Sequence, residues 1–145
     1  MIVVDTTILV YAIGSDHPLA KPCRDLVRLI SIGEVHATTT PEVIQELTHV
    51  RARRRDREDA IRVARDFAAL LSPLLAVTAE DLDAGLDLFA RTPLGAFDAV
   101  LAAAALRSGC ELFVSADRAF AAVDGLLVGD PAAADFLARV RAARR

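Results

Sequence analysis

Short, continuously apolar segments alternate with longer amphipathic segments along this chain. Apolar runs such as Ile2–Val4 are typical of strands buried on both faces, whereas apolar residues spaced three or four apart are typical of helices packed on a sheet. The alternation predicts an α/β fold, a three-layer α/β/α sandwich around a central parallel sheet. We expect strands near residues 2–5, 35–38, 75–77, 112–114 and 126–128.

Helices are predicted between these strands and after the last one. The periodicity predicts them at residues 8–13, 19–32, 58–71, 79–90 and 94–106, with one more around Val43–Val50 and a final one from Pro131. The helix around Val43–Val50 and the one at 58–71 read as a helical hairpin with an arginine-rich turn. No repeat, low-complexity segment or linker interrupts the pattern, so residues 1–145 are predicted to form a single domain.

The predicted helix at 94–106 is apolar on every side, which is typical of a buried helix. Asp98 is the only charged residue within it. A carboxylate buried there without a partner would be strongly unfavourable or would be forced into its neutral form. An ion pair with Arg107 or Arg118 would explain Asp98 structurally, whereas a bound cation would explain it functionally.

Two further carboxylates follow predicted strands. Asp5 comes directly after the first strand, and Asp117 comes shortly after the strand at 112–114. Right-handed crossovers bring the carboxyl ends of parallel strands to one edge of the sheet, where α/β proteins build their sites. We therefore expect Asp5 and Asp117 at one edge, beside the start of the Asp98 helix, with Glu46 reaching the same place. Each has an ordinary alternative: Asp5 and Asp117 as helix caps, and Glu46 as a surface residue.

Four converging carboxylates would repel one another, so their convergence indicates a bound cation. An all-oxygen ligand set selects Mg²⁺, or Mn²⁺ in its place, and not zinc. His17, His36 and His49 have no ligand spacing and are interpreted as solvated. The chemistry that remains for such a site is attack of metal-activated water on a phosphodiester.

Other functions of an acidic metal site stay open from the residues alone. A DNA-directed nuclease or a phosphatase would use the same acids. A phosphoacceptor module also gathers acids around Mg²⁺ but requires a lysine near the site. Lys21 is the only lysine, and it lies on a predicted helix far in sequence from Asp5 and Asp117, which argues against that module.

Composition limits the location of the protein and points to a basic region. The formal net charge of −3 does not by itself indicate a nucleic-acid partner, but arginines cluster between residues 51 and 65 and again between 139 and 145. Cys23 and Cys110 match no zinc or redox spacing and favour a reducing compartment. The start of the chain does not resemble a signal peptide, and no apolar run approaches the roughly 20 residues of a membrane span. We expect a soluble cytoplasmic protein.

Four segments, in this order and spacing, resemble the motifs of PIN domains: VVDTTILVYA, EVIQELTHV, GAFDAVLAAAAL and LFVSADRAF. The likeness extends over essentially the whole chain and is closest to the VapC-type toxins of bacterial toxin–antitoxin pairs. It implies an α/β/α sandwich and an Mg²⁺-dependent endoribonuclease that cleaves RNA and is neutralised by a VapB-type antitoxin. A homodimer is also implied, because PIN toxins typically dimerise. A catalytically silent PIN fold that only binds a partner is the alternative within the family.

The resemblance also assigns roles to individual residues. It carries the family's acids over to Asp5, Glu46, Asp98 and Asp117. Of these, Asp5 and Asp98 are implied as direct metal ligands. Thr7 and Ser115 occupy supporting positions next to the first and fourth acids. Ala119 departs from relatives that carry a further acid there, which leaves the number of bound metal ions open.

The arginines of the predicted helical hairpin have two interpretations. They would neutralise RNA phosphates beside the active-site groove, or they would form a solvated hairpin tip with interleaved acids. We predict RNA contact for Arg53, Arg54 and Arg55, and the solvated interpretation for Arg62 and Arg65. With six Phe, one Tyr and no Trp, base stacking is not indicated, so specificity is expected to come from RNA shape.

Overall fold

The structure is a computed structural model that describes residues 1–143. Its centre is a parallel sheet of four strands, β1 (Ile2–Val4), β2 (Ala37–Thr38), β3 (Leu112–Val114) and β4 (Val128–Gly129), in the order β2-β1-β3-β4. The helices are α1 (Thr6–Ile13), α2 (Ala20–Ser31), α3 (Pro41–Ala52), α4 (Arg57–Leu70), α5 (Ala79–Arg91), α6 (Ala96–Arg107), α7 (Phe136–Ala142) and the short 3-10 helix η1 (Arg118–Ala122). This arrangement confirms the predicted α/β/α fold around a parallel sheet.

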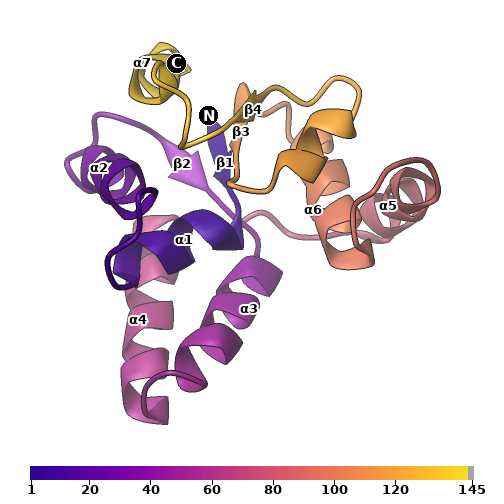
Figure 1. Cartoon of the computed structure of the whole chain (residues 1–145). Helices are drawn as coiled ribbons and strands as arrows, with labels where there is room; N and C mark the ends of the chain where they lie inside the picture. Colours follow the sequence, from indigo (N-terminus) through magenta and orange to yellow (C-terminus); the bar gives the residue numbers. More distant parts are fainter. Residues whose placement is uncertain (144–145) are drawn as a thin grey trace.

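Helices cover the sheet on both sides. Figure 1 shows α1 and α2 on one side of the strands, with α6 and α5 on the other and the α3–α4 hairpin extending away from the sheet. Sequential helices pack as pairs: α5 lies along α6, α3 along α4, and α1 along α2, while α1 also contacts α3. α1 begins directly after Asp5 and α3 carries Glu46, so the contact between these two helices brings two predicted site residues toward each other.

The register of the two central strands places the residues that follow them side by side. Val4 of β1 pairs with Val114 of β3, and the Asp5 backbone N–H donates to the Val114 carbonyl at 3.0 Å. Because all four strands are parallel, their carboxyl ends share one edge of the sheet. Asp5 and Ser115 therefore leave that edge together.

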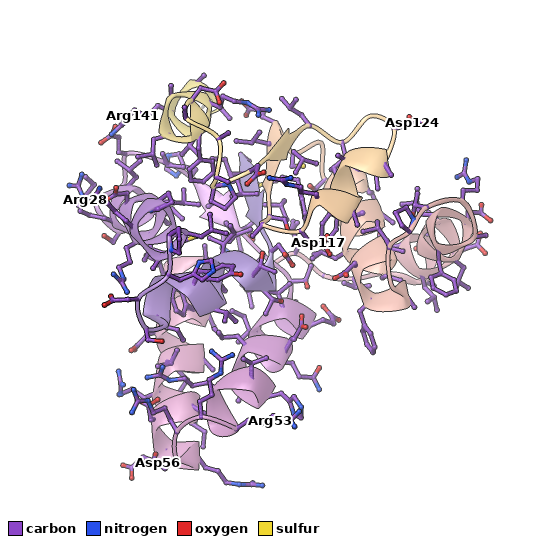
Figure 2. The ribbon with its side chains drawn as sticks, in the orientation of Figure 1. Arg28, Arg53, Asp56, Asp117, Asp124 and Arg141 are labelled. Atoms are coloured by element: carbon purple, nitrogen blue, oxygen red, sulfur yellow. The ribbon has the colours of Figure 1, made fainter. Side chains whose placement is uncertain are left out.

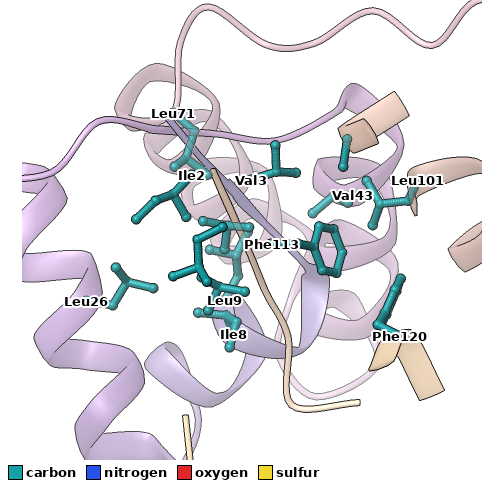
Figure 3. Close-up of a cluster of buried hydrophobic side chains, with 14 of the residues drawn as sticks. Ile2, Val3, Ile8, Leu9, Leu26, Val43, Leu71, Leu101, Phe113 and Phe120 are labelled. Atoms are coloured by element: carbon teal, nitrogen blue, oxygen red, sulfur yellow. The ribbon is translucent and has the colours of Figure 1, made fainter. Parts of the chain in front are cut away.

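Buried apolar side chains hold the carboxyl edge of the sheet in place. Ile2, Val3 and Phe113 are fully buried in the sheet, and the Phe113 ring lies 4.5 Å, centroid to centroid, from the ring of Phe120 in η1 (Figure 3). The contact between Phe113 and Phe120 holds η1 against β3, so the turn between them, which carries Asp117, is fixed at both of its ends. Burial of these side chains supplies the main stabilisation of the edge.

The strand predicted at 75–77 is wrong. This segment is an extended connection that makes one backbone hydrogen bond to the end of β2, from the Leu75 N–H to the Thr39 carbonyl at 2.9 Å. Pro73 just before it has no N–H, so a continuous ladder of bonds cannot form there. The strand at 112–114 has the predicted ends, and the strand at 2–5 ends one residue early, at Val4. The other two are shifted: β2 is limited to residues 37–38, and β4 lies at 128–129 where 126–128 was expected.

Two helix predictions also need correction. The helix predicted as buried throughout 94–106 begins at Ala96, and its first turn faces solvent: Phe97 is 87% exposed. The final helix begins at Phe136, after a turn, where Pro131 was predicted. Of the basic residues expected near the end, Arg141 pairs with Glu34 at 2.9 Å, and Arg144 and Arg145 lie outside the described residues.

The rest of α6 is held close to α5. A Cβ atom placed on Gly85 of α5 would lie 2.7 Å from the Cα of Val100 in α6, so only glycine permits this approach. The contact fixes the position of α6, and with it the position of Asp98. None of the helices within residues 1–143 has both the length and the apolarity that a membrane crossing requires.

Candidate active site

Asp5 is the most constrained of the predicted site residues. It is 3% exposed and caps the N-terminus of α1, where its Oδ1 accepts from the Thr6 N–H at 2.7 Å. Its Oδ2 accepts from the hydroxyls of Ser115, at 2.7 Å, and Thr7, at 2.8 Å. The capping role proposed as an alternative is thus realised, but the hydroxyls bind the carboxylate on the opposite oxygen and fix its orientation.

The pKa of Asp5 lies above its ordinary value because burial disfavours the charged form. The hydrogen bonds from Ser115, Thr7 and the Thr6 backbone act in the opposite direction and lower it, without cancelling the effect of burial. A nearby positive charge would therefore stabilise the ionised form of Asp5.

The same two hydroxyls also hold the turn after β3. Ser115 Oγ accepts from the Asp117 N–H at 2.9 Å, and Thr7 Oγ1 accepts from the Ala116 N–H at 3.0 Å. Asp117 itself is exposed, and its Oδ1 caps η1 by accepting from the Ala119 N–H at 2.9 Å. Thr7 and Ser115 therefore link Asp5 to the backbone of the segment that carries Asp117.

Glu46 approaches from α3. Its side chain is exposed, and its Oε2 accepts a hydrogen bond of 2.6 Å from the hydroxyl of Thr6, the first residue of α1. The contact between α1 and α3 thus brings Glu46 toward the carboxyl end of β1. Glu46 is a surface residue, as the alternative has it, but its carboxylate is also bonded to the start of α1.

Asp98 lies in the first turn of α6 and is half-buried. Its pKa is raised from the ordinary value of 3.8 to about 6, first by burial and then by the negative charges of Asp5, Glu46 and Asp117. Asp98 is therefore within electrostatic reach of each of the other three predicted acids. The structure brings the predicted acids together from β1, α3, α6 and the turn after β3.

The structural alternative for Asp98, an ion pair with Arg107 or Arg118, is wrong. Arg107 binds Asp81 of α5, with its Nε at 2.6 Å from Oδ1 and its Nη2 at 2.9 Å from Oδ2. Arg118 lies 3.6 Å from Asp130. Within residues 1–143 no arginine or lysine forms an ion pair with Asp98, so its repulsion by the neighbouring acids has no basic partner to offset it.

Two of the four acids line a groove of about 580 Å³ between α3 and the start of α6. Glu46 and Asp98 lie in its lining together with apolar side chains that include Val43, Phe97 and Leu101. Figure 2 labels Asp117 on the part of the molecule between the sheet and α6. A molecule bound in the groove would contact the carboxylates of Glu46 and Asp98.

The donor set fits a hydrated hard cation better than a closed metal cage. In the part of the chain that the structure describes, no three His, Cys, Asp or Glu side chains are placed so that together they could hold a metal ion. Mg²⁺, however, keeps several waters and is usually bound through one or two carboxylates. Asp5 Oδ1 accepts only the Thr6 N–H and so retains a free lone pair for this purpose.

Two features of the site were not apparent from the sequence. The hydroxyl of Thr6 was not expected to contact Glu46, because the direction of a side chain in the first turn of a helix is set by packing against α3. Phe97, counted among the few aromatic residues, stands exposed beside Asp98. The position of Thr6 directly after Asp5 was the only sequence signal for the first feature.

We expect Asp98→Asn to melt at a higher temperature than the wild type in EDTA at pH 7.5. A carboxylate whose folded pKa is raised destabilises the fold as pH rises, here between about 4 and about 6. The shift corresponds to at most about 3 kcal/mol, and we expect about 1–2 kcal/mol after allowing for solvent exposure and for the favourable α6 N-terminus.

Melting curves between pH 4 and pH 8 measure this effect. The variant should gain on the wild type as pH rises from about 4 to about 6, with no further gain above that, and the exposed α5 substitution Asp83→Asn should show no such gain. A lower melting temperature for Asp98→Asn in EDTA at neutral pH would mean that a favourable partner of Asp98 had been removed.

Comparison with known proteins gives three concordant matches. The sequence profile of the PIN domain matches residues 2–126. Ribonuclease VapC7 of Mycobacterium tuberculosis (strain ATCC 25618 / H37Rv) is 54% identical over 126 residues, which are 83% of this chain and 85% of that protein. The crystal structure of VapBC2 from Rickettsia felis bound to a DNA fragment from their promoter matches with a TM-score of 0.69 and 18% identity, covering 90% of this chain and 98% of that one. At that identity, the last match bears on the fold alone.

Proposed function

The chain belongs to the PIN-domain family, and from that membership we propose that it is an Mg²⁺-dependent endoribonuclease toxin of the VapC type. The observation that carries the proposal is the placement of Asp5, Glu46 and Asp117 around Asp98, which all three repel, with Glu46 and Asp98 in the lining of a groove. The similarity to a protein named a ribonuclease supports RNA as the substrate class.

Each of the site residues has its own role in the proposed hydrolysis, set by its position. Asp5 and Asp98 would hold the metal ion, with Asp117 and Glu46 adding negative charge around it. When bound, Mg²⁺ lowers the pKa of a water and neutralises charge on a phosphate. Thr7 and Ser115 keep the Asp5 carboxylate in one orientation, because both hydroxyls donate to the same oxygen. Glu46 is exposed in the groove and is thus placed to accept a proton from water.

The substrate class is tested by offering matched nucleic acids. A structured RNA and a DNA of the same sequence, each incubated with the purified protein and Mg²⁺, should give cleavage of the RNA only. Cleavage of the DNA at an equal or greater rate would favour the alternative of a DNA-directed nuclease.

The position of the only lysine argues against the phosphoacceptor alternative. Lys21, the only lysine of the chain, lies on α2 and pairs with Asp25 at 2.7 Å. A phosphoacceptor site needs a lysine beside the acids, and α2 leaves the sheet away from Asp98.

We propose that Arg53, Arg54 and Arg55 contact RNA phosphates. They occupy the turn between α3 and α4, at the tip of the hairpin where Figure 2 labels Arg53. All three are exposed, and among residues 1–143 their side chains form no hydrogen bond or ion pair. Arg51 and Arg62 differ, because both bind Asp59.

Replacing these three arginines with glutamine should weaken RNA binding and lower its salt dependence. Each lost phosphate contact reduces the slope of log K against log salt by about 0.7–0.9, so the triple variant should lose about 2. Filter binding between 50 and 300 mM KCl measures the slope. The double variant Arg62→Gln/Arg65→Gln is the control, and an equal change in both variants would contradict the assignment.

We also propose a homodimer formed through the exposed apolar face of α5 and the start of α6. Leu82, Leu86 and Phe89 are about half exposed on one face of α5, and Phe97 projects beside the apolar groove. A projecting ring next to a groove is self-complementary under twofold symmetry. Two copies would bury roughly 800 Å² through these side chains alone, about half of a standard interface.

Phe97→Asp should convert the dimer into a monomer, because it places a charge in the centre of the proposed interface. Light scattering after size-exclusion chromatography gives the mass directly. Ile32→Asp, at an exposed apolar residue after α2, is the matched control and should remain dimeric. A dimeric Phe97→Asp protein would exclude this face.

A VapB-type antitoxin is the proposed inhibitor. The proposal follows from membership of the PIN-domain family and from the similarity to Ribonuclease VapC7, because VapC-type toxins are paired with such antitoxins. The acidic lining of the groove would attract a guanidinium, so we propose that an arginine of the antitoxin binds near Asp5 or Asp98. A structure of the complex without any basic antitoxin side chain near either acid would refute this binding mode.

A further inference from the structure

We propose that Thr6 is a positioning residue that holds Glu46 in the active site, an inference that rests on the proposed function of the four acids. Thr6 contacts two of them at once. Its backbone N–H donates to Asp5 Oδ1 at 2.7 Å, and its hydroxyl donates to Glu46 Oε2 at 2.6 Å. No other residue joins the acid of β1 to the acid of α3 in this way within residues 1–143.

Glu46 needs such a contact because little else fixes it. Its side chain is exposed, and in the described part of the chain the Thr6 hydroxyl is its only hydrogen-bond donor. Repulsion among Glu46, Asp98 and the other acids favours rotation of this flexible side chain toward solvent. A charge-assisted hydrogen bond of 2.6 Å opposes that rotation.

Thr6 can hold Glu46 in place because its own position is fixed by packing. It is buried, it opens α1 directly after the cap residue Asp5, and α1 packs against both α2 and α3. In residues 1–143 its hydroxyl has no partner besides Glu46. A hydroxyl in the first turn of a helix commonly bonds to its own backbone, so its direction toward another helix is a specific feature of this site.

A double-mutant cycle separates positioning from a purely structural role. Thr6→Val removes the hydroxyl and keeps the shape, Thr6→Ser keeps the hydroxyl, and Glu46→Ala removes the side chain that Thr6 holds. The first readout is Mg²⁺ affinity, obtained from the rise of the melting temperature with Mg²⁺ concentration. The second is the cleavage of RNA, resolved into kcat and KM.

We expect Thr6→Val to lower kcat and Mg²⁺ affinity by about tenfold to a hundredfold, the factor that one hydrogen bond to a charged group supports. The KM for RNA should change little, and Thr6→Ser should retain most of both properties. In the Glu46→Ala background, Thr6→Val should cause no further loss. If Thr6→Val fails to fold, Thr6→Ala completes the same cycle.

The cycle distinguishes failure of this inference from failure of the proposed function. Independent losses from Thr6→Val and Glu46→Ala in Mg²⁺ affinity would overturn the positioning role, whatever the activity of the protein. If the effects of Thr6→Val and Glu46→Ala on Mg²⁺ affinity are coupled as expected but the wild type cleaves no RNA, the positioning role stands and the ribonuclease assignment is wrong. A wild type with no affinity for Mg²⁺ would overturn both.

Discussion

Asp5→Asn is expected to lower the rate of RNA cleavage by about a thousandfold or more while leaving the protein folded. Asparagine keeps the shape of the side chain but removes the charge that would hold Mg²⁺. Loss of metal assistance to a phosphodiester hydrolysis costs several kcal/mol of transition-state stabilisation, and each 1.4 kcal/mol is a factor of ten in rate.

The fold should tolerate this change for two reasons. Asparagine is as good a helix cap as aspartate, so the bond from the Thr6 N–H is retained. Burial raises the pKa of Asp5, so its negative charge is unfavourable in the metal-free fold, and removing the charge offsets the two hydroxyl bonds that Oδ2 accepts from Ser115 and Thr7.

Single-turnover cleavage and thermal melting, measured on the same preparation, test both halves of the expectation. Asp83→Asn, an equivalent change at an exposed position on α5, should cleave at the wild-type rate. Near wild-type cleavage by Asp5→Asn would remove Asp5 from the mechanism.

Arg107→Ala is expected to lower the free energy of unfolding by about 3 kcal/mol. Asp81 is 2% exposed, and Arg107 binds both of its oxygens while also donating to the Ala76 carbonyl at 2.9 Å. Breaking a buried pair by removing one partner costs about 3–5 kcal/mol, because the remaining charge stays buried. We expect the lower end because the Arg107 side chain is 45% exposed.

The pH dependence gives a second signature of this pair. The hydrogen bond from Arg107 lowers the pKa of Asp81, so the stabilisation is present above the ordinary carboxyl pKa and is lost as pH falls through the folded value. The difference between the wild type and Arg107→Ala should therefore shrink in acid. Urea unfolding at pH 7 and pH 3 measures both values.

Arg118→Ala is the matched control. Its side chain is 85% exposed and lies 3.6 Å from Asp130, so its removal should cost less than about 1 kcal/mol. Equal losses from Arg107→Ala and Arg118→Ala would mean that the α5–α6 pair contributes no more than a surface contact.

The sequence was sufficient to predict the sheet edge because the central strands are short and wholly apolar. Such strands are buried on both faces and must be parallel, so the residues that follow them meet at one edge. Asp5 and the Ser115–Asp117 turn come directly after β1 and β3, and no side-chain geometry was needed to bring them together. The order of the strands was not predictable in this way.

Features that depend on the choice between several polar partners were not predictable. Asp98 and Arg107 both lie on α6, about 13 Å apart along the helix axis, so they cannot pair. The packing of α5 on α6, which the sequence does not specify, brings Asp81 to Arg107 instead. The direction of the Thr6 hydroxyl likewise depends on where α3 lies. The exposure of Phe97 follows from the open groove at the start of α6, which an apolar pattern does not reveal.

The metal dependence of RNA cleavage tests the central claim most directly, because the claim is that four acids act through a bound cation. Single-turnover cleavage of a structured RNA should be absent in EDTA, rise to saturation with added Mg²⁺, and return when excess Mg²⁺ is restored after chelation. Mn²⁺ should substitute for Mg²⁺. Cleavage in EDTA at the rate seen with Mg²⁺ would contradict the account.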